Sequence, residues 1–135
     1  MATDFRDLRV WEEAMALAEM VYGATASFPV DERYGLAAQV KRAAVSVPSC
    51  IVEGNARSST RDYLRFRSMA KGSLVEVQTQ IQLALRLGFL DKSAADQVLE
   101  KARLTSVLLL GLRKSLAAKL PRTSSSPLPI PASPL

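Results

Sequence analysis

Four long segments of this chain repeat apolar residues at intervals of three and four positions. In the second segment Leu36, Val40, Val47 and Ile51 share this spacing, which places them on one face of an α-helix. No segment alternates apolar and polar residues as a half-buried β-strand does. Aromatic residues are few, so a core has to be built from aliphatic side chains. We therefore expect an all-α fold.

Capping and helix-breaking residues divide the pattern into four helices joined by short connections. The expected spans are 7–27, capped by Asp7 and stopped by Pro29; 32–54; 60–87, capped by Ser59 or Thr60 and ended by Gly88; and 92–120, capped by Asp91. Long helices with short connections are typical of an antiparallel up-down-up-down four-helix bundle, which residues 1–120 would form.

The last segment, residues 121–135, has a different composition. It holds five prolines and four serines, so it can neither form a helix nor bury a core, and we expect it to be disordered. Its sequence "PLPIP" leaves open a second interpretation, a ligand for a polyproline-binding groove.

The stretch "AAVSVPSCIVEG", residues 43–54, interrupts the second helix with a proline beside the single cysteine. Pro48 removes the hydrogen bond to the carbonyl of Ala44, so we expect a kink there. Cys50 lies near the end of the helix, where the helix dipole opposes thiolate formation, so we expect it to be buried and unreactive. Glu53 is also close to this end and needs a cation such as Arg42 or Arg57.

Catalytic and cofactor motifs are missing from the sequence. The chain has no histidine, which removes the commonest general base and metal ligand, and it has neither a Walker loop nor a G-x-G-x-x-G sequence. We expect no enzyme activity, no metal site and no cofactor. The carboxylates Glu12, Glu13 and Glu19 are interpreted as a solvated face or as partners in salt bridges between subunits.

Charge is distributed unevenly along the chain. Residues 1–32 carry two arginines against seven acids, whereas residues 33–86 carry nine Lys and Arg against three acids. Arg57, Arg61 and Arg65 recur at four-residue spacing, which places Arg61 and Arg65 along one line of the third helix, and Arg57 with them if the helix extends back that far. Together with Arg42 and Lys71 they are candidate contacts to nucleic-acid phosphates. The alternative is that they pair with the acidic first helix of a neighbouring subunit.

Two helices carry more apolar surface than one bundle needs. The first helix has two apolar stripes, one through Leu8, Trp11, Met15, Ala18 and Tyr22 and another through Val10, Ala14, Leu17, Val21 and Phe28. The fourth is apolar almost all round at "VLLLGL", residues 107–112. We predict a symmetric homo-oligomer. Its predicted interface residues are Val10, Ala14, Leu17, Val21, Leu108 and Leu112. The alternative is one wide stripe that serves a deep core.

Three stretches carry a family resemblance that covers roughly residues 5–118. They are "FRDLRVWEEAMALAEMVY", "FPVDERYGLAAQVKRAAVSVPSCIVEG" and "RSSTRDYLRFRSMAKGSLVEVQTQIQLALRLGFL". In this order and spacing the sequence is similar to the 23S rRNA intervening-sequence proteins, also called the four-helix bundle protein family. That family resembles in fold the accessory variability determinant proteins of diversity-generating retroelements.

The family's "SIPSNIAEG" reads "SVPSCIVEG" here, so Ser46, Pro48, Glu53 and Gly54 match while Cys50 replaces an asparagine. Val52 stands in an alanine position. The resemblance implies a homopentameric barrel of four-helix bundles and an association with structured RNA or with a reverse transcriptase.

Taken together, we expect a non-catalytic, cytoplasmic homo-oligomer, with no membrane association, that binds RNA or DNA through its basic face. The alternative function is a protein-interaction scaffold that uses its pentameric surface or its proline-rich tail and does not bind nucleic acid.

Overall fold

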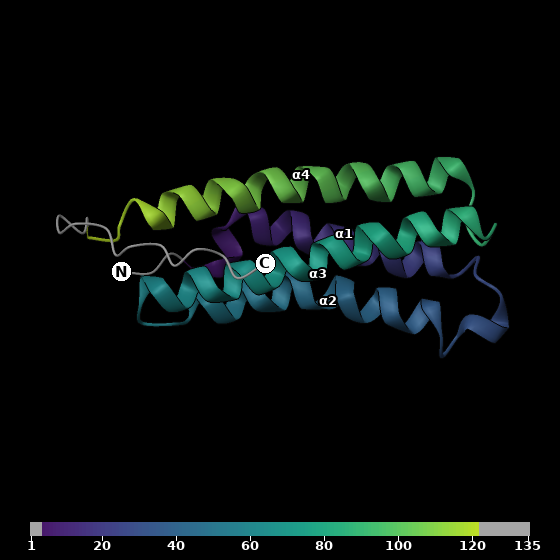
Figure 1. The fold of residues 1–135 in the computed structure, drawn as a ribbon, viewed down its shortest axis with the longest axis horizontal. Helices are drawn as coiled ribbons and strands as arrows, with labels where there is room; N and C mark the ends of the chain where they lie inside the picture. The colour runs from purple at the N-terminus through teal and green to yellow at the C-terminus, as the bar shows by residue number, and fades with distance from the viewer. Residues whose placement is uncertain (1–3, 122–135) are drawn as a thin grey trace, which may run out of the picture.

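The computed structural model describes residues 4–121, which form helices and no strand (Figure 1). The long helices are α1 Arg9–Thr25, α2 Leu36–Asn55, α3 Thr60–Arg86 and α4 Lys92–Ala117, and the short 3₁₀ helices are η1 Phe5–Asp7 and η2 Val30–Glu32. The expected all-α fold with four long helices is confirmed. The proline-rich tail, apart from Pro121, lies outside the described residues.

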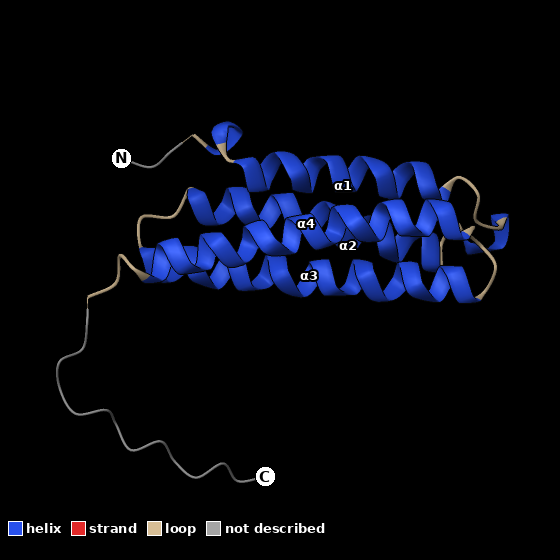
Figure 2. Ribbon diagram, turned by 90° about the horizontal axis from the view of Figure 1, so that it is seen from above, coloured by secondary structure: helices blue, strands red, loops and turns tan. Residues whose placement is uncertain are grey.

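The four long helices pack side by side as a bundle. Both α2 and α4 pack against α1 and against α3, so each helix has two neighbours. The α1–α2 and α3–α4 connections lie at one end of the bundle, and the α2–α3 turn lies at the other (Figure 2). None of the helices in residues 4–121 has the length and hydrophobicity that crossing a bilayer requires.

Both ends of α3 and the start of α4 are formed by the capping residues that the sequence predicts. The Ser59 hydroxyl accepts a hydrogen bond from the Asp62 amide at 3.1 Å, and the Asp91 carboxylate accepts one from the Ala94 amide at 2.8 Å. Gly88 adopts a φ of 77°, which favours glycine. The amides of Gly88 and Phe89 then bond back to the carbonyls of Leu85 and Ala84, which ends α3 in a Schellman motif.

Two predicted helix starts are wrong. α1 begins at Arg9 with Leu8 as its N-cap, not Asp7, because residues 5–7 form the separate turn η1. α2 begins at Leu36 rather than directly after Asp31, because residues 30–32 form η2. There the Glu32 carboxylate accepts the Leu36 amide at 3.0 Å and replaces a cap that Gly35 cannot supply.

The structure places the predicted interface stripe of α1 in the core of the bundle. Four of the predicted interface residues face the core of their own chain and are at most 6% exposed: Val10, Ala14, Leu17 and Val21. They cannot contact a second copy, so this part of the interface prediction is wrong. Small and mid-sized side chains fill the narrow centre of the bundle. The larger Met15 and Tyr22 of the other stripe point outward and are 36% and 51% exposed. Leu108 and Leu112 are partly buried against the core.

Pro48 lies inside α2, which is continuous from Leu36 to Asn55, and its side chain is buried. The kink expected at Pro48 stays a prediction.

Candidate nucleic-acid interface

Three of the predicted phosphate contacts gather at the α2–α3 end of the bundle. Arg57 lies in the turn, and Arg61 and Arg65 lie on the first two turns of α3, all exposed. The guanidinium carbons of Arg57 and Arg65 stand 4.7 and 4.6 Å from the centre of the Phe66 ring, close enough for cation–π attraction. Asp62 approaches Arg65 to 3.7 Å. Arg61 and Arg65 lie one turn apart on α3, as their spacing predicts, whereas Arg57 precedes the helix and meets Arg65 at the Phe66 ring; these three are called the arginine row.

The other two predicted contacts lie elsewhere. Lys71 follows Arg65 by six residues, which turns it about 120° around α3, toward α4. Its ammonium donates a hydrogen bond to the Ser106 hydroxyl of α4 at 2.9 Å. Arg42 is exposed on α2, in a shallow depression that Glu76 of α3 also lines. The structure does not bring Arg42 and Lys71 to the arginine row.

Arg67 is a cation whose position the sequence reasoning missed. Its side chain is 9% exposed and reaches across to α4, where Nη1 donates to the Leu109 carbonyl at 3.2 Å. Its Nε is buried and has no hydrogen-bond partner. Burial, and then the nearby charge of Arg113, lower the pKa of Arg67 below its ordinary value. The spacing of the sequence could have predicted its burial. Arg67 precedes Ala70 and Leu74 by three and seven residues, which places it on the core-facing side of α3.

The packed halves of α3 and α4 around Arg67 contain no carboxylate of their own. Residues 63–75 and 101–121 carry eight Lys and Arg and no Asp or Glu. Three of these cations pair with carboxylates outside the two segments: Arg65 with Asp62, Lys101 with Glu13 and Arg103 with Glu100. The other five make no ion pair within residues 4–121: Arg67, Lys71, Arg113, Lys114 and Lys119. These halves of α3 and α4, called the α3–α4 face below, therefore carry five cations without an ion pair within residues 4–121 and no carboxylate of their own.

One carboxylate of the acidic first helix forms an ion pair within the same chain. Glu13 of α1 pairs with Lys101 of α4, with 2.9 Å between Oε2 and Nζ and both side chains mostly buried. For this carboxylate the predicted solvated or intersubunit role is wrong. Glu12 and Glu19 are exposed.

The motif residues Ser46 and Gly54 join α2 to α3. The Ser73 hydroxyl donates to the Ser46 hydroxyl at 2.8 Å, and the Cys50 sulfur lies 3.6 Å from the same oxygen. Gly54 is buried, and a Cβ added there would lie 2.8 Å from Cδ1 of Tyr63. Ser46 and Gly54 therefore hold the two helices at close distance. Cys50 is buried, as expected.

Glu53 and Pro48 border an apolar groove between α1 and α2. Trp11, Met15 and Tyr22 line the α1 side of this groove, and Val45 and Val52 line the α2 side. Glu53 is exposed and has no ion pair within residues 4–121, so the expected pairing with Arg42 or Arg57 does not occur in one chain.

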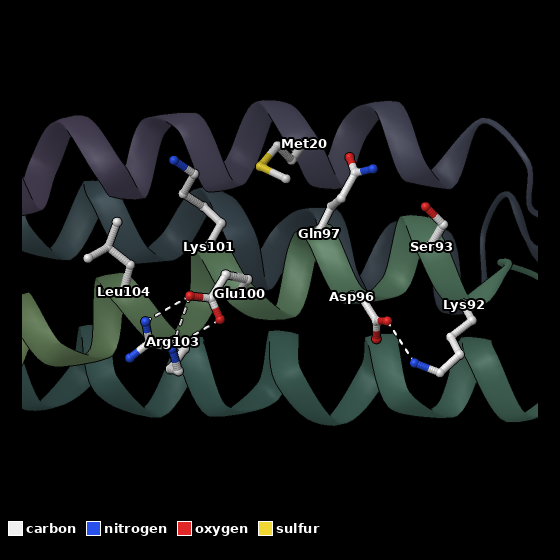
Figure 3. Close-up of a pocket in the computed structure, with 9 residues that line it drawn as sticks. All are labelled: Met20, Lys92, Ser93, Asp96, Gln97, Glu100, Lys101, Arg103 and Leu104. Carbon is white, nitrogen blue, oxygen red and sulfur yellow. Dashed lines mark hydrogen bonds and ion pairs between the residues drawn. The ribbon is translucent and has the colours of Figure 1, made fainter.

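A surface depression of about 770 Å³ lies along α4, with Met20 of α1 on its far side (Figure 3). Figure 3 shows its charges paired along α4, Lys92 with Asp96 at 2.7 Å and Arg103 with Glu100 at 2.7 Å. The hydrogen bonds from Arg103 lower the pKa of Glu100. Because these charges are already balanced, this depression offers less to a charged ligand than the α3–α4 face. Among residues 4–121, no three His, Cys, Asp or Glu side chains cluster as a metal site would require.

Comparison with known proteins gives a family and a fold. The family model described as 23S rRNA-intervening sequence protein matches residues 6–111. No curated protein matches. Among solved structures, a protein of unknown function from the S23 ribosomal protein family of Bacteroides thetaiotaomicron superposes with a TM-score of 0.71 at 17% identity. The match covers 78% of this chain and 98% of that one, and at this identity it shows a shared fold alone.

Proposed function

Because the chain belongs to the 23S rRNA-intervening sequence protein family, we propose that it is a non-catalytic protein that binds structured RNA through cationic side chains of α3, α4 and the α2–α3 turn. The observation that carries this proposal is the unbalanced charge of the α3–α4 face, where five of eight cations make no ion pair within residues 4–121. Unbalanced cations close together repel one another, and a polyanion relieves that repulsion while it releases its own counterions.

The arginine row would supply the first contacts. Arg61 makes no ion pair within residues 4–121, and the guanidinium groups of Arg57 and Arg65 are already held near the Phe66 ring. A guanidinium in a fixed position loses less side-chain entropy when it binds a phosphate. Such contacts recognise the shape of a folded RNA rather than its base sequence.

RNA affinity measured by fluorescence anisotropy with a labelled stem-loop RNA tests this proposal. The double variant R61E/R65E should lose about tenfold or more in affinity, and its binding should depend less steeply on salt between about 50 and 200 mM. The matched control R33E/K92E makes the same change in net charge at the opposite end of the bundle and should bind nearly as wild type does. Equal losses in both variants would leave net charge as the sole cause and contradict the proposed interface.

We also propose that the protein assembles as a homo-oligomer, with a pentamer as the expected state. The exposed stripe of α1 and the apolar groove beside it support this proposal, since Met15, Tyr22 and Val45 are each at least 36% exposed. Light scattering behind a sizing column should give a multiple of the monomer mass. Met15→Glu should dissociate the assembly, whereas Leu83→Glu, on an exposed site of α3, should leave it intact.

The same groove favours a second candidate function, a scaffold that binds a protein partner without nucleic acid. An apolar groove bordered by Trp11 and Tyr22 suits the kind of side chains that dominate protein interfaces. A protein partner that stays bound after nuclease treatment, and is lost in Met15→Glu, would support the scaffold. No affinity for RNA at low salt would then exclude the first proposal.

A further inference from the structure

A small pocket between α3 and α4 brings together three of the five cations of the α3–α4 face that make no ion pair within residues 4–121. Arg67 and Lys71 line it from α3, and Ser106 and Arg113 line it from α4. The pocket has a volume of about 310 Å³. Val107 and Leu110 form its apolar rim and are 53% and 43% exposed. Three cations thus share one hollow with a hydroxyl and no acid.

The buried cation is the strongest sign that this pocket is built for a ligand. Arg67 as a whole is 9% exposed, and the Nε of its guanidinium is buried away from water. One hydrogen bond to the Leu109 carbonyl replaces part of the hydration of the guanidinium, but the buried Nε has no partner. Burying a charge without an opposite charge is unfavourable. The position of Arg113, close enough to lower the pKa of Arg67, adds to this cost.

A simpler explanation is that Arg67 merely covers the core with its aliphatic stem while its head reaches toward water. That explanation accounts for Arg67 alone. It does not explain why Lys71 and Arg113 line the same pocket, or why the Ser106 hydroxyl holds the Lys71 ammonium there at 2.9 Å. A lysine has three N–H donors, so Lys71 keeps two for a ligand.

The pocket offers many donors and no anionic acceptor, and the cations come from two helices. A ligand that satisfies all three cations needs several oxygens pointing in different directions, and a tetrahedral phosphate has them, whereas a carboxylate has two oxygens in one plane. We propose that the pocket formed by Arg67, Lys71, Ser106 and Arg113 binds a single phosphate group. If that phosphate belongs to RNA, this inference rests on the proposed function and gives the RNA an anchoring point; if it is free phosphate, the pocket is a separate site.

Inorganic phosphate is the first probe. Isothermal titration calorimetry of the full chain at low salt should show saturable binding of inorganic phosphate, and addition of the same ionic strength as chloride should not reproduce it. Arg113→Gln and Lys71→Met should each weaken this binding about tenfold or more, as expected for loss of a charge-assisted contact. Arg113 is exposed, so its replacement is not expected to disturb folding. The matched control is Lys114→Gln, an exposed neighbour that does not line the pocket.

Measuring RNA affinity in the same variants distinguishes phosphate of the RNA backbone from free phosphate. Arg113→Gln should lower RNA affinity together with phosphate affinity if the RNA backbone fills the pocket, and phosphate affinity alone if free phosphate does. R61E/R65E should keep phosphate binding, so loss of RNA binding in that variant tests the proposed function separately. No saturable phosphate binding by the wild type, or equal binding by Arg113→Gln and Lys114→Gln, would overturn the phosphate pocket.

Discussion

Replacement of Gly54 by alanine is the sharpest test of how α2 and α3 pack. A Cβ at this position would lie 2.8 Å from Cδ1 of Tyr63 and 2.9 Å from Cβ of Phe66. The Tyr63 ring can turn aside. The Cβ of Phe66 is attached to the α3 backbone, so relief of the second contact requires the two helices to separate.

The expected net effect follows from two opposing terms. Alanine improves the helical propensity of a glycine position by up to about 1 kcal/mol, and by less at Gly54, which is one residue before the end of α2. Overpacking a buried contact costs about 1–3 kcal/mol, and the contact to Phe66 cannot relax by side-chain rotation. We expect Gly54→Ala to lower the free energy of unfolding by about 2 kcal/mol.

Urea unfolding at one protein concentration measures this change, and two other glycines supply the controls. Cβ atoms added at Gly72 of α3 and Gly111 of α4 would meet no atom within 4 Å. Gly72→Ala and Gly111→Ala should therefore raise the free energy of unfolding by up to about 1 kcal/mol. Tyr63→Ala in the Gly54→Ala background should not restore packing fully. A Gly54→Ala protein as stable as the Gly72→Ala protein would refute the close contact between α2 and α3.

Three further predictions concern single side chains. Burial raises the pKa of Tyr63 above its ordinary value of about 10, so deprotonation is easier in the unfolded chain, and stability should fall as pH rises from about 10 toward the folded-state pKa. Denaturant unfolding between those pH values should show a smaller fall for Tyr63→Phe, while the same change at exposed Tyr34 should behave as wild type does. Lys101→Met should lower the free energy of unfolding by about 1–3 kcal/mol, and a double-mutant cycle with Glu13→Gln should assign part of that loss to the pair. Asp91→Ala should cost about 1 kcal/mol and reduce hydrogen-exchange protection in the first turn of α4, and unchanged protection would contradict its capping role.

The elements that the sequence predicts well are those set by local chemistry. Ser59 and Asp91 cap their helices with their own side chains, and Gly88 ends α3 because it accepts a positive φ. The start of α2 depends on Glu32 reaching over a separate turn to the Leu36 amide, a contact that no capping pattern in the sequence marks.

The orientation of α1 could not be decided from its sequence, because both of its stripes are apolar. Which stripe faces inward depends on packing against the other three helices, which buries Ala14 and Leu17 fully and leaves Met15 exposed. The neighbouring positions of Arg61 and Arg65 were predictable because four-residue spacing on a helix is a local property, whereas Arg57 lies in the turn before that helix. The pocket around Arg67 was not, because it needs Arg113, which lies 46 positions later and meets it only through the packing of α3 on α4.

The order of neighbours in the bundle also has a consequence for how the chain folds. The contacts α1 with α2, α2 with α3 and α3 with α4 join helices that follow each other, so most of the structure can form through short loop closures, a topology associated with folding in microseconds to milliseconds. The contact of α1 with α4 is different, since Glu13 and Lys101 are 88 residues apart. Formation of that pair therefore marks the step at which the first helix docks on the last, and a kinetic probe placed there would report closure of the bundle separately from growth of its helices.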